Sequence, residues 1–270
     1  AGAAAGQTAR TGAQAMSAAL LEVRGLSMSF GGLRAVENIA LDVAADEVFA
    51  VIGPNGAGKT TVFNCISGFY KPGSGRVRLD GKDVSGLPSH KMARRGLVRT
   101  FQSPRLFKKL TVLENLLVAQ HQHLQTALLP GFFTMPSYRR AEKAALDAAH
   151  QWLDFMELGA YAHRPSSQLP YGHQRKLEIA RCMAARPRVL LLDEPAAGLN
   201  PSEKRELQQL ILQLRAQFGI AILFIEHDMS MVMGISDRIL VMDRGQAIAC
   251  GAPDEVRANP RVIKAYLGDE

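Results

Sequence analysis

The segment VFAVIGPNGAGKTTVFNCIS, residues 48–67, constrains the fold more than any other part of the sequence. Its first five residues are short in extent, apolar and mostly β-branched, which is typical of a strand buried on both faces. A glycine-rich stretch follows, and Lys59 to Ser67 are expected to form a helix that stops at Gly68. A buried strand, a glycine-rich loop and a helix in direct succession predict an α/β fold.

The loop in this segment has the spacing Gly-x-x-x-x-Gly-Lys-Thr, which is the P-loop pattern. Its glycines let backbone N–H groups and the helix N-terminus face phosphate oxygens. Lys59 is expected to reach the β- and γ-phosphates, and the Thr60 hydroxyl to bind Mg²⁺. A glycine turn beside an unrelated lysine is the alternative, and the flanking strand and helix argue against it. The candidate nucleotide-binding residues are Gly53, Pro54, Asn55, Gly56, Ala57, Gly58, Lys59, Thr60 and Thr61.

The segment VLLLDE ends in two acidic residues, Asp193 and Glu194, after four apolar ones. Asp193 is expected to hold the metal at the end of a buried strand, and Glu194 to orient or deprotonate an attacking water. Two carboxylates at one strand end are costly without a cation, which argues against a purely structural role. The chain also lacks an NKxD sequence for guanine recognition, so ATP is the expected nucleotide.

The remaining segments place this site within a larger outline. LLEVRGLSMSF and LRAVENIALDV alternate, which predicts an antiparallel opening, and RVRLDGKDV (76–84) predicts a hairpin. The middle third has helical periodicity at 111–123 and at 141–158, where Gly159 is expected to end the helix. LLPGFFTMPSYRR, between these helices, is broken by prolines and glycine and predicts a loop or short helices. The last third returns to buried strands, joined by a helix at 201–217 in a right-handed crossover.

Composition limits the class of protein. With 47% apolar and 21% charged residues, the chain of 270 residues suits a soluble globular protein, and it has no apolar run of 18 residues that would span a bilayer. Cys65, Cys182 and Cys250 stand in apolar surroundings and are expected to be reduced core residues of a cytosolic protein. Residues 1–16 are small and low in complexity, which predicts a disordered tail or an added remnant, with Met16 as the natural start.

The net charge of +7 is unevenly distributed. No acidic residue occurs between Asp83 and Glu114. Three interpretations stay open: a solvated basic face, a nucleic-acid patch, or a surface that faces anionic lipid. Few aromatic residues interrupt this stretch, which weakens the nucleic-acid interpretation. Its basic residues are Lys82, Lys91, Arg94, Arg95, Arg99, Arg105, Lys108 and Lys109.

Further motifs give the chain a resemblance. After GPNGAGKTT come RTFQ, which ends at Gln102, the helical middle third, LPYGHQ at 169–174, VLLLDEP, and FIEHD with His227. This order resembles the ATP-binding cassette (ABC) ATPases across residues 20–250. The resemblance implies an α/β fold with a P-loop NTPase core of ABC ATPase type, an antiparallel β subdomain and an inserted α-helical subdomain.

The resemblance also implies roles for single residues. Gln102 would sense Mg²⁺ and water while it links the core to the helical lobe, and His227 would sense the γ-phosphate beside Glu194. Phe30 would place its ring against adenine, and Gly172 and Gln174 would contact ATP across a dimer. Taken alone, each has an ordinary alternative, such as a polar loop residue, a strand-end histidine or a core aromatic ring.

Two positions depart from the family pattern. The usual signature LSGGQ is replaced by LPYGH at 169–173, and Pro170 has neither a serine hydroxyl nor a backbone N–H for a γ-phosphate. Phosphate recognition there would depend on Gly172 and the helix N-terminus. Asn200, in AGLN, stands where aspartate is usual, so it keeps hydrogen bonding but lacks charge. Both changes raise a question about the strength of the signature half.

RTFQSPRLF, ENLLVAQH, YGHQRKLEIARCM, DEPAAGLNP, IEHDM and NPRVIKAYLG are similar to the larger ATPase subunit of high-affinity branched-chain amino-acid importers. This resemblance implies a head-to-tail dimer with a homologous ATPase, two transmembrane permease subunits, an extracytoplasmic binding protein, and a place at the cytoplasmic face of the inner membrane. The basic 91–109 stretch would face the docking side. The implied domain spans 17–268, with a core at 17–104 and 168–250, a helical subdomain at 105–167 and a C-terminal helical segment at 251–268.

Other functions stay open at this point. An importer ATPase for another small solute, such as urea or amides, has the same motifs. A soluble ABC ATPase that acts on nucleic acid would suit the sequence pI of about 9.5, but such proteins usually carry coiled-coil or zinc insertions, or two cassettes in one chain. A P-loop small-molecule kinase would lack the signature and His227. We expect no nucleic-acid partner.

Overall fold

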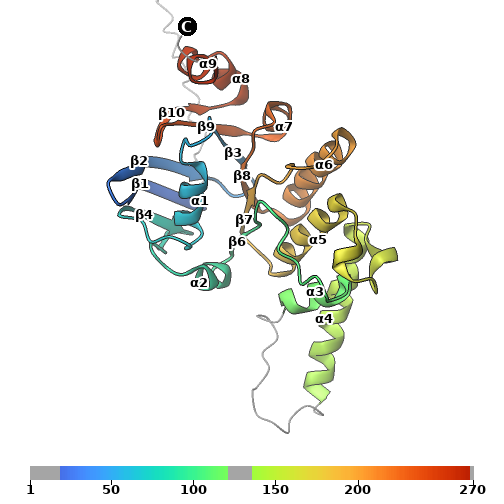
Figure 1. Ribbon diagram of the computed structural model, residues 1–270. Coiled ribbons are helices and arrows are strands. Elements are labelled where there is room, and N and C mark those ends of the chain that lie inside the picture. Colours follow the sequence, from blue (N-terminus) through green and yellow to red (C-terminus); the bar gives the residue numbers. More distant parts are fainter. Residues whose placement is uncertain (1–18, 121–135, 268–270) are drawn as a thin grey trace, which may run out of the picture.

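Two β-sheets organise the chain in this computed structural model, which describes residues 19–120 and 136–267 (Figure 1). The expected tail at 1–16 lies outside these residues, as do the end of the helix expected at 111–123 and most of the loop after it. Helix α1 (Lys59–Ile66) packs between the sheets, because its buried residues Val62 and Phe63 share one hydrophobic core with strands of both.

The smaller sheet is antiparallel and confirms the expected opening of the fold. Along its central strand, Leu21, Val23 and Leu26 are fully buried. Asp80 and Gly81 have φ values of 52° and 70°, the left-handed pair that a two-residue hairpin turn needs. The strand order is β2-β1-β4-β5, with β1 (Leu21–Phe30), β2 (Leu33–Val43), β4 (Ser74–Leu79) and β5 (Lys82–Asp83).

The larger sheet has a parallel body and one antiparallel edge strand. Its strand β3 is buried on both faces, as expected: Val48 and Ala50 face one hydrophobic core, and Phe49 and Val51 face the other. The order is β10-β9-β3-β8-β7-β6, with β3 (Val48–Ile52), β6 (Leu97–Arg99), β7 (Val189–Asp193), β8 (Ala221–Ile225), β9 (Arg238–Asp243) and β10 (Gln246–Gly251).

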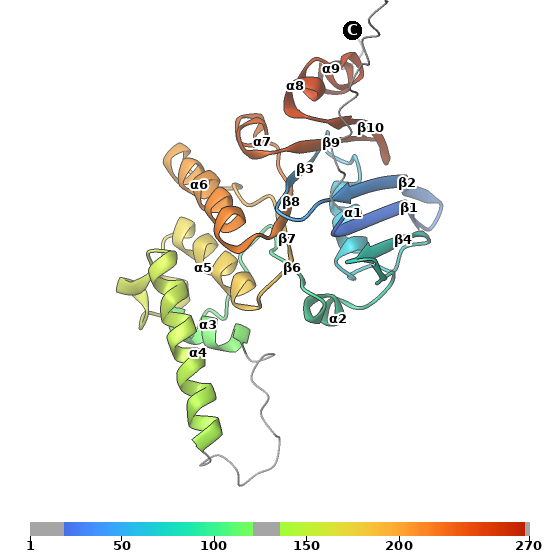
Figure 2. The ribbon, with the colours of Figure 1, turned by 180° about the vertical axis from the view of Figure 1, so that it is seen from behind.

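Most helices pack on the side of the larger sheet opposite α1, around a second core (Figure 2). They are α3 (Val112–Gln120), α4 (Pro136–Phe155), α5 (Tyr171–Ala184), α6 (Pro201–Phe218) and α7 (Met229–Ile235). Short 3₁₀ turns at Gly159–Tyr161 and Ser166–Gln168 join α4 to α5. Helix α2 (Ser89–Arg94) precedes β6, and α8 (Pro253–Arg257) and α9 (Pro260–Leu267) follow β10.

Helix α4 differs from its expected bounds at both ends. It begins at Pro136, inside the sequence expected to be a loop or short helices, because proline is tolerated in the first turn of a helix. It ends at Phe155, before Gly159: Glu157 has a φ of 59°, and Gly159 opens a 3₁₀ turn instead. The predicted apolar stripe is correct, since Ala149 and Leu153 are buried against α3 and α5.

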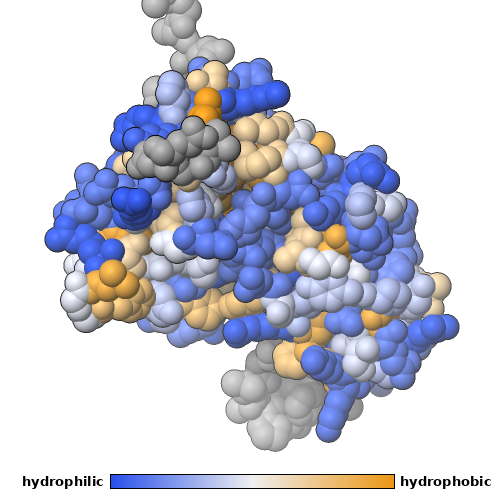
Figure 3. Space-filling model, turned by 45° about the horizontal axis from the view of Figure 1, so that its top comes forward, coloured by the Kyte–Doolittle hydropathy of each residue, from blue (hydrophilic) through white to orange (hydrophobic). Residues whose placement is uncertain are grey.

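The cysteines are only partly as expected. Cys65 and Cys182 are buried, but Cys250 is exposed, because it lies on β10, an edge strand with a single neighbour. Within the described residues, no helix has both the length and the apolar character needed to cross a membrane. The face drawn in Figure 3 is largely hydrophilic, with apolar residues in small separate patches.

Candidate functional site

The site lies where the carboxyl ends of β3, β7 and β8 meet, which is the usual position for a ligand site in a parallel sheet. A pocket of about 520 Å³ opens there, within the range of small-molecule sites. The predicted loop forms one wall, and Glu194 and His227 form part of another. The lining residues are Leu33, Arg34, Ala35, Asn55, Gly56, Gly58, Lys59, Thr60, Thr61, Glu194, His227 and Arg244.

The glycine-rich loop is folded tightly onto its neighbours. A Cβ atom at Gly53 would lie 2.1 Å from the carbonyl oxygen of Met242, and Gly58 has a φ of 95° as it leads into α1. The Lys59 ammonium donates to the carbonyl oxygens of Gly53, at 2.7 Å, and Pro54, at 2.9 Å. Burial lowers the pKa of Lys59, and the nearby Glu194 carboxylate opposes this shift. The lysine is therefore held inside the loop where phosphate recognition was predicted.

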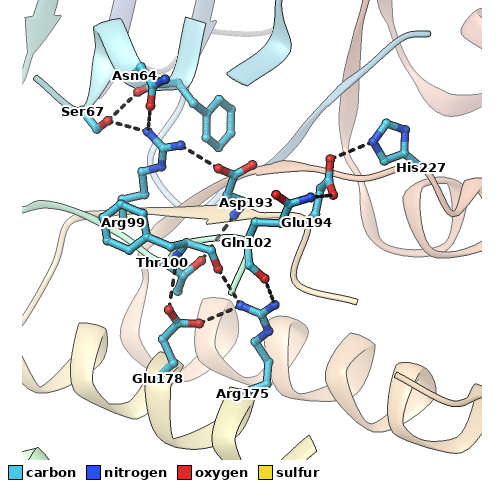
Figure 4. Close-up of polar contacts among 12 residues, drawn as sticks. Asn64, Ser67, Arg99, Thr100, Gln102, Arg175, Glu178, Asp193, Glu194 and His227 are labelled. Atoms are coloured by element: carbon cyan, nitrogen blue, oxygen red, sulfur yellow. Dashed lines mark hydrogen bonds and ion pairs between the residues drawn. The ribbon is translucent and has the colours of Figure 1, made fainter. Parts of the chain in front are cut away.

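Glu194 lies between two side chains that the sequence analysis singled out (Figure 4). Gln102 Nε2 donates to Glu194 Oε2 at 2.7 Å, and His227 Nε2 lies 2.8 Å from Glu194 Oε1. The three residues come from the loop after β6, the end of β7 and the end of β8. The structure therefore brings Gln102, Glu194 and His227 together beside Lys59 and Thr60, with both carboxylate oxygens held at fixed positions.

Asp193 has a partner that was not foreseen. Its Oδ2 accepts from Arg99 Nη2 at 2.6 Å, and the two side chains are only 7% and 5% exposed. Arg99 also donates to Asn64 Oδ1, at 2.7 Å, and Ser67 Oγ, at 2.9 Å. Arg99 is thus not part of an exposed basic surface, and the interpretation of 82–109 as one solvated or lipid-facing stretch is wrong for this residue.

The residues present fit Mg²⁺. The Asp193 carboxylate keeps Oδ1 beside the one that Arg99 holds, and Thr60 lines the pocket with its hydroxyl. A carboxylate, a hydroxyl and phosphate oxygens are the hard ligands that Mg²⁺ uses, with water completing the set. Among the described residues, no group of three or more His, Cys, Asp or Glu residues forms a metal cage, which agrees with a cation held largely by the phosphates.

The remaining predicted residues lie outside this pocket. Phe30 is 43% exposed and makes an edge-to-face contact with Tyr70, at 5.4 Å between ring centroids. Gly172 and Gln174 lie in the first turn of α5, and the Gln174 amide donates to the Leu169 carbonyl oxygen at 2.9 Å. A side chain at position 172 would meet Glu203 Oε1 at 2.7 Å.

Asn200 has a structural task. Its side-chain oxygen caps α6 by accepting from the backbone N–H groups of Ser202, at 2.9 Å, and Glu203, at 3.0 Å. Glu203 in turn accepts from the Asn200 backbone N–H, which completes a capping box. Asparagine performs this task as well as aspartate does, so the departure from the family pattern leaves the helix start intact.

Three buried charged residues were missed. Glu226, 4% exposed, accepts from the backbone N–H groups of Ala196 and His227, and burial raises its pKa. It ties the loop after β7 to the loop after β8. Its position at the end of an apolar strand, like that of Asp193, was the available signal. Arg175 and Glu178, in α5, form the second unexpected ion pair, at 2.7 Å.

Comparisons with known proteins agree with this geometry. The family model described as "ABC transporter" matches residues 36–197, and that described as "Branched-chain amino acid ATP-binding cassette transporter" matches 248–270. The chain is 56% identical, over 94% of its length and 100% of theirs, to the high-affinity branched-chain amino acid transport ATP-binding proteins BraF of Pseudomonas aeruginosa and LivG of Escherichia coli.

Solved structures confirm the predicted fold class. A nucleotide-free ATP-binding cassette from an ABC transporter superposes with a TM-score of 0.80 and 31% identity, over 93% of this chain and 100% of that one. An ADP conformation of such a cassette gives a TM-score of 0.80 and 32% identity, over 93% and 99%. The chain therefore belongs to the ABC transporter family of ATP-binding cassettes.

Proposed function

We propose that this chain is the ATP-hydrolysing subunit of an importer for branched-chain amino acids. The observation that carries the enzymatic part is Glu194, whose two carboxylate oxygens are held by Gln102 and His227 beside the P-loop lysine. The choice of branched-chain amino acids is supported by the named function of the relatives that match over their full length.

In this proposal the chain's residues divide the chemistry between them. The P-loop backbone and Lys59 bind the β- and γ-phosphates, and Thr60 and Asp193 hold Mg²⁺, which neutralises charge on the phosphate oxygens. Glu194 orients water for attack on the γ-phosphorus and accepts its proton. His227 and Gln102 fix the direction of the Glu194 carboxylate, and His227 contacts the γ-phosphate. The products are ADP and inorganic phosphate.

The assembly is part of the proposal. Gly172 and Gln174 open α5 outside the chain's own pocket, and this suits a head-to-tail dimer in which they contact the ATP of a homologous subunit. Two transmembrane permease subunits, an extracytoplasmic binding protein and a place at the cytoplasmic face of the inner membrane complete the importer. The exposed basic residues of 91–109 would face the docking side.

Replacement of Glu194 by glutamine tests the enzymatic part. The variant keeps hydrogen-bonding oxygen and nitrogen atoms at the same place but cannot accept a proton at neutral pH. We expect ATP to bind with unchanged affinity and phosphate release to fall by a factor of about 100 to 10,000, the usual contribution of a general base. Turnover equal to that of the unchanged chain would remove Glu194 from this role.

The form in which the γ-phosphate leaves separates the alternatives. Radiolabel from γ-labelled ATP should appear as free phosphate. Label on a small-molecule acceptor would instead indicate a kinase. Stimulation of ATP hydrolysis by DNA or RNA, without stimulation by permease subunits, would indicate the soluble ATPase that acts on nucleic acid.

A further inference from the structure

Helix α5 carries a buried ion pair, Arg175–Glu178, that the proposed chemistry does not use. The two side chains are 1% and 5% exposed, and Arg175 is the largest fully buried side chain in the described chain. The cost of removing two charges from water offsets much of their attraction, so a buried pair contributes little to stability. The reason for this pair is therefore to be found in what it binds.

Both members of the pair bind the backbone around Gln102 (Figure 4). Arg175 Nη1 donates to the Phe101 carbonyl oxygen at 2.7 Å, and Nη2 donates to the Gln102 carbonyl oxygen at 2.6 Å. Glu178 Oε1 accepts from the backbone N–H groups of Phe101 and Arg105, each at 3.3 Å. Residues 100–107 form no helix or strand, so these four hydrogen bonds replace the ladder that would otherwise fix their position.

The clamp, Arg175 with Glu178, connects two parts of the site. Arg175 lies four residues after Tyr171, about 6 Å along the helix axis from the first residue of α5. Its Nη2 atom also lies 3.4 Å from the Tyr171 hydroxyl. On its far side the clamp holds the backbone of Gln102, whose amide donates to Glu194. A continuous line of contacts thus runs from LPYGHQ to the reactive carboxylate of the same chain.

We propose that Arg175 and Glu178 are positioning residues that set Gln102 against Glu194 according to the position of the α5 N-terminus. A helix moves as a rigid rod, so closure of its first turn on a partner's nucleotide displaces the clamp and the Gln102 backbone with it. The hydrolytic half of this chain thereby responds to the nucleotide bound by its signature half. This inference depends on the head-to-tail pairing proposed above.

Hydrogen exchange read by mass spectrometry tests the clamp directly. The full-length chain, purified with its bound partner subunits, is measured with and without Mg²⁺ and AMP-PNP, a non-hydrolysable ATP analogue. Two peptides are followed, one covering 53–61 and one covering 101–106. In the unchanged chain AMP-PNP should slow exchange in both. In Arg175→Met, exchange at 101–106 should be about 10- to 100-fold faster, as for loss of buried charged hydrogen bonds, and should not respond to AMP-PNP.

Kinetics and controls separate positioning from simple loss of structure. Arg175→Met should lower kcat at least about tenfold while the KM for ATP stays within about twofold, since P-loop contacts are untouched; Arg175→Lys, which keeps the charge, should lie between. Arg238→Met removes another ion pair, to Glu47 at 2.6 Å, far from Gln102, and should leave exchange at 101–106 unchanged.

The outcomes are distinct. Absence of AMP-PNP protection at 53–61 would remove the proposed function itself. Protection at 53–61 without any nucleotide response at 101–106 in the unchanged chain, or with the same response in Arg175→Met, would overturn the clamp. An equal effect of Arg238→Met at 101–106 would reduce the clamp to general destabilisation.

Discussion

At the residue scale, the proposed catalysis depends on how the chain holds Glu194. Its φ of 46° lies in the left-handed region, which costs a non-glycine residue about 1–3 kcal/mol. Its backbone N–H donates to the Ile225 carbonyl oxygen at 3.0 Å, so the strained turn is fixed to the end of β8. This backbone directs the carboxylate towards Gln102 and His227, and the strain therefore falls on the residue to which we assign proton transfer.

Arg99 should be important for stability because it is the cation beside a buried carboxylate. Replacement of Arg99 by methionine leaves Asp193 without a counter-charge and removes the hydrogen bonds to Asn64 and Ser67. We expect the free energy of unfolding, measured in urea at pH 7, to fall by about 3–5 kcal/mol.

An exposed ion pair serves as the control for that measurement. Arg188 and Asp80 lie 2.7 Å apart, but their side chains are 51% and 52% exposed. Arg188→Met should therefore change the free energy of unfolding by less than about 1 kcal/mol. An equal, small effect of both substitutions would show that the Arg99–Asp193 pair does not matter for folding.

The residues that sequence motifs predicted at the site are those fixed by local spacing. Gly53 to Thr61 are continuous in sequence, and Glu194 and His227 each follow an apolar strand. Arg99 could not be assigned in this way, because its partner Asp193 is 94 residues away and its sequence context is a run of basic residues. Charge alone did not distinguish a buried arginine from its exposed neighbours.

At the scale of elements, the start of α7 holds His227 in position. Asp228 caps this helix: its carboxylate accepts from the Ser230 and Met231 backbone N–H groups and lies 2.7 Å from the Lys204 ammonium. These donors, with the Lys204 contact the largest, hold the pKa of Asp228 down to about 2. Because the folded pKa is below the unfolded value, this stabilisation is present above about pH 4 and is lost as pH falls towards 2.

Asp228→Ala should therefore destabilise the chain by about 0.5–2 kcal/mol at pH 7, the usual cost of losing a cap. The difference from the unchanged chain, read from urea unfolding or thermal melting at several pH values, should shrink as pH falls below 4. Asp228→Asn is the matched control, since it keeps the capping oxygen without a titrating charge. A difference for Asp228→Ala that is independent of pH down to about 2 would contradict the assigned cause.

Strands were easier to predict than helix ends. The bounds of β2 and β3 agree with the predicted segments, because alternation and uninterrupted burial are visible in short stretches. The bounds of α4 were wrong because Pro136 can open a helix and because Glu157, not glycine, takes the left-handed conformation that ends it. Cys250 was misplaced for a similar reason, since sequence did not show that β10 is an edge strand.

At the scale of the whole molecule, the nucleotide pocket and the first turn of α5 are separate features of one chain. The pocket lies at the carboxyl ends of the parallel strands, whereas Gly172 lines a different hollow between α5 and α6. The motif order predicted both parts, and the fold class followed from it. The motif order could not reveal the Arg175–Glu178 clamp between the two parts, because those side chains meet residues about 75 positions away.

Leucine uptake into proteoliposomes tests the central claim most directly. The chain is reconstituted with its permease subunits and partner ATPase, ATP is enclosed on the side of this chain, and leucine-loaded binding protein is added on the other. The account predicts leucine uptake that consumes ATP, little uptake of urea or amides, and loss of both uptake and ATP consumption with Glu194→Gln. Equal leucine uptake with Glu194→Gln, or ATP consumption that responds to urea or amides and not to leucine, would contradict it.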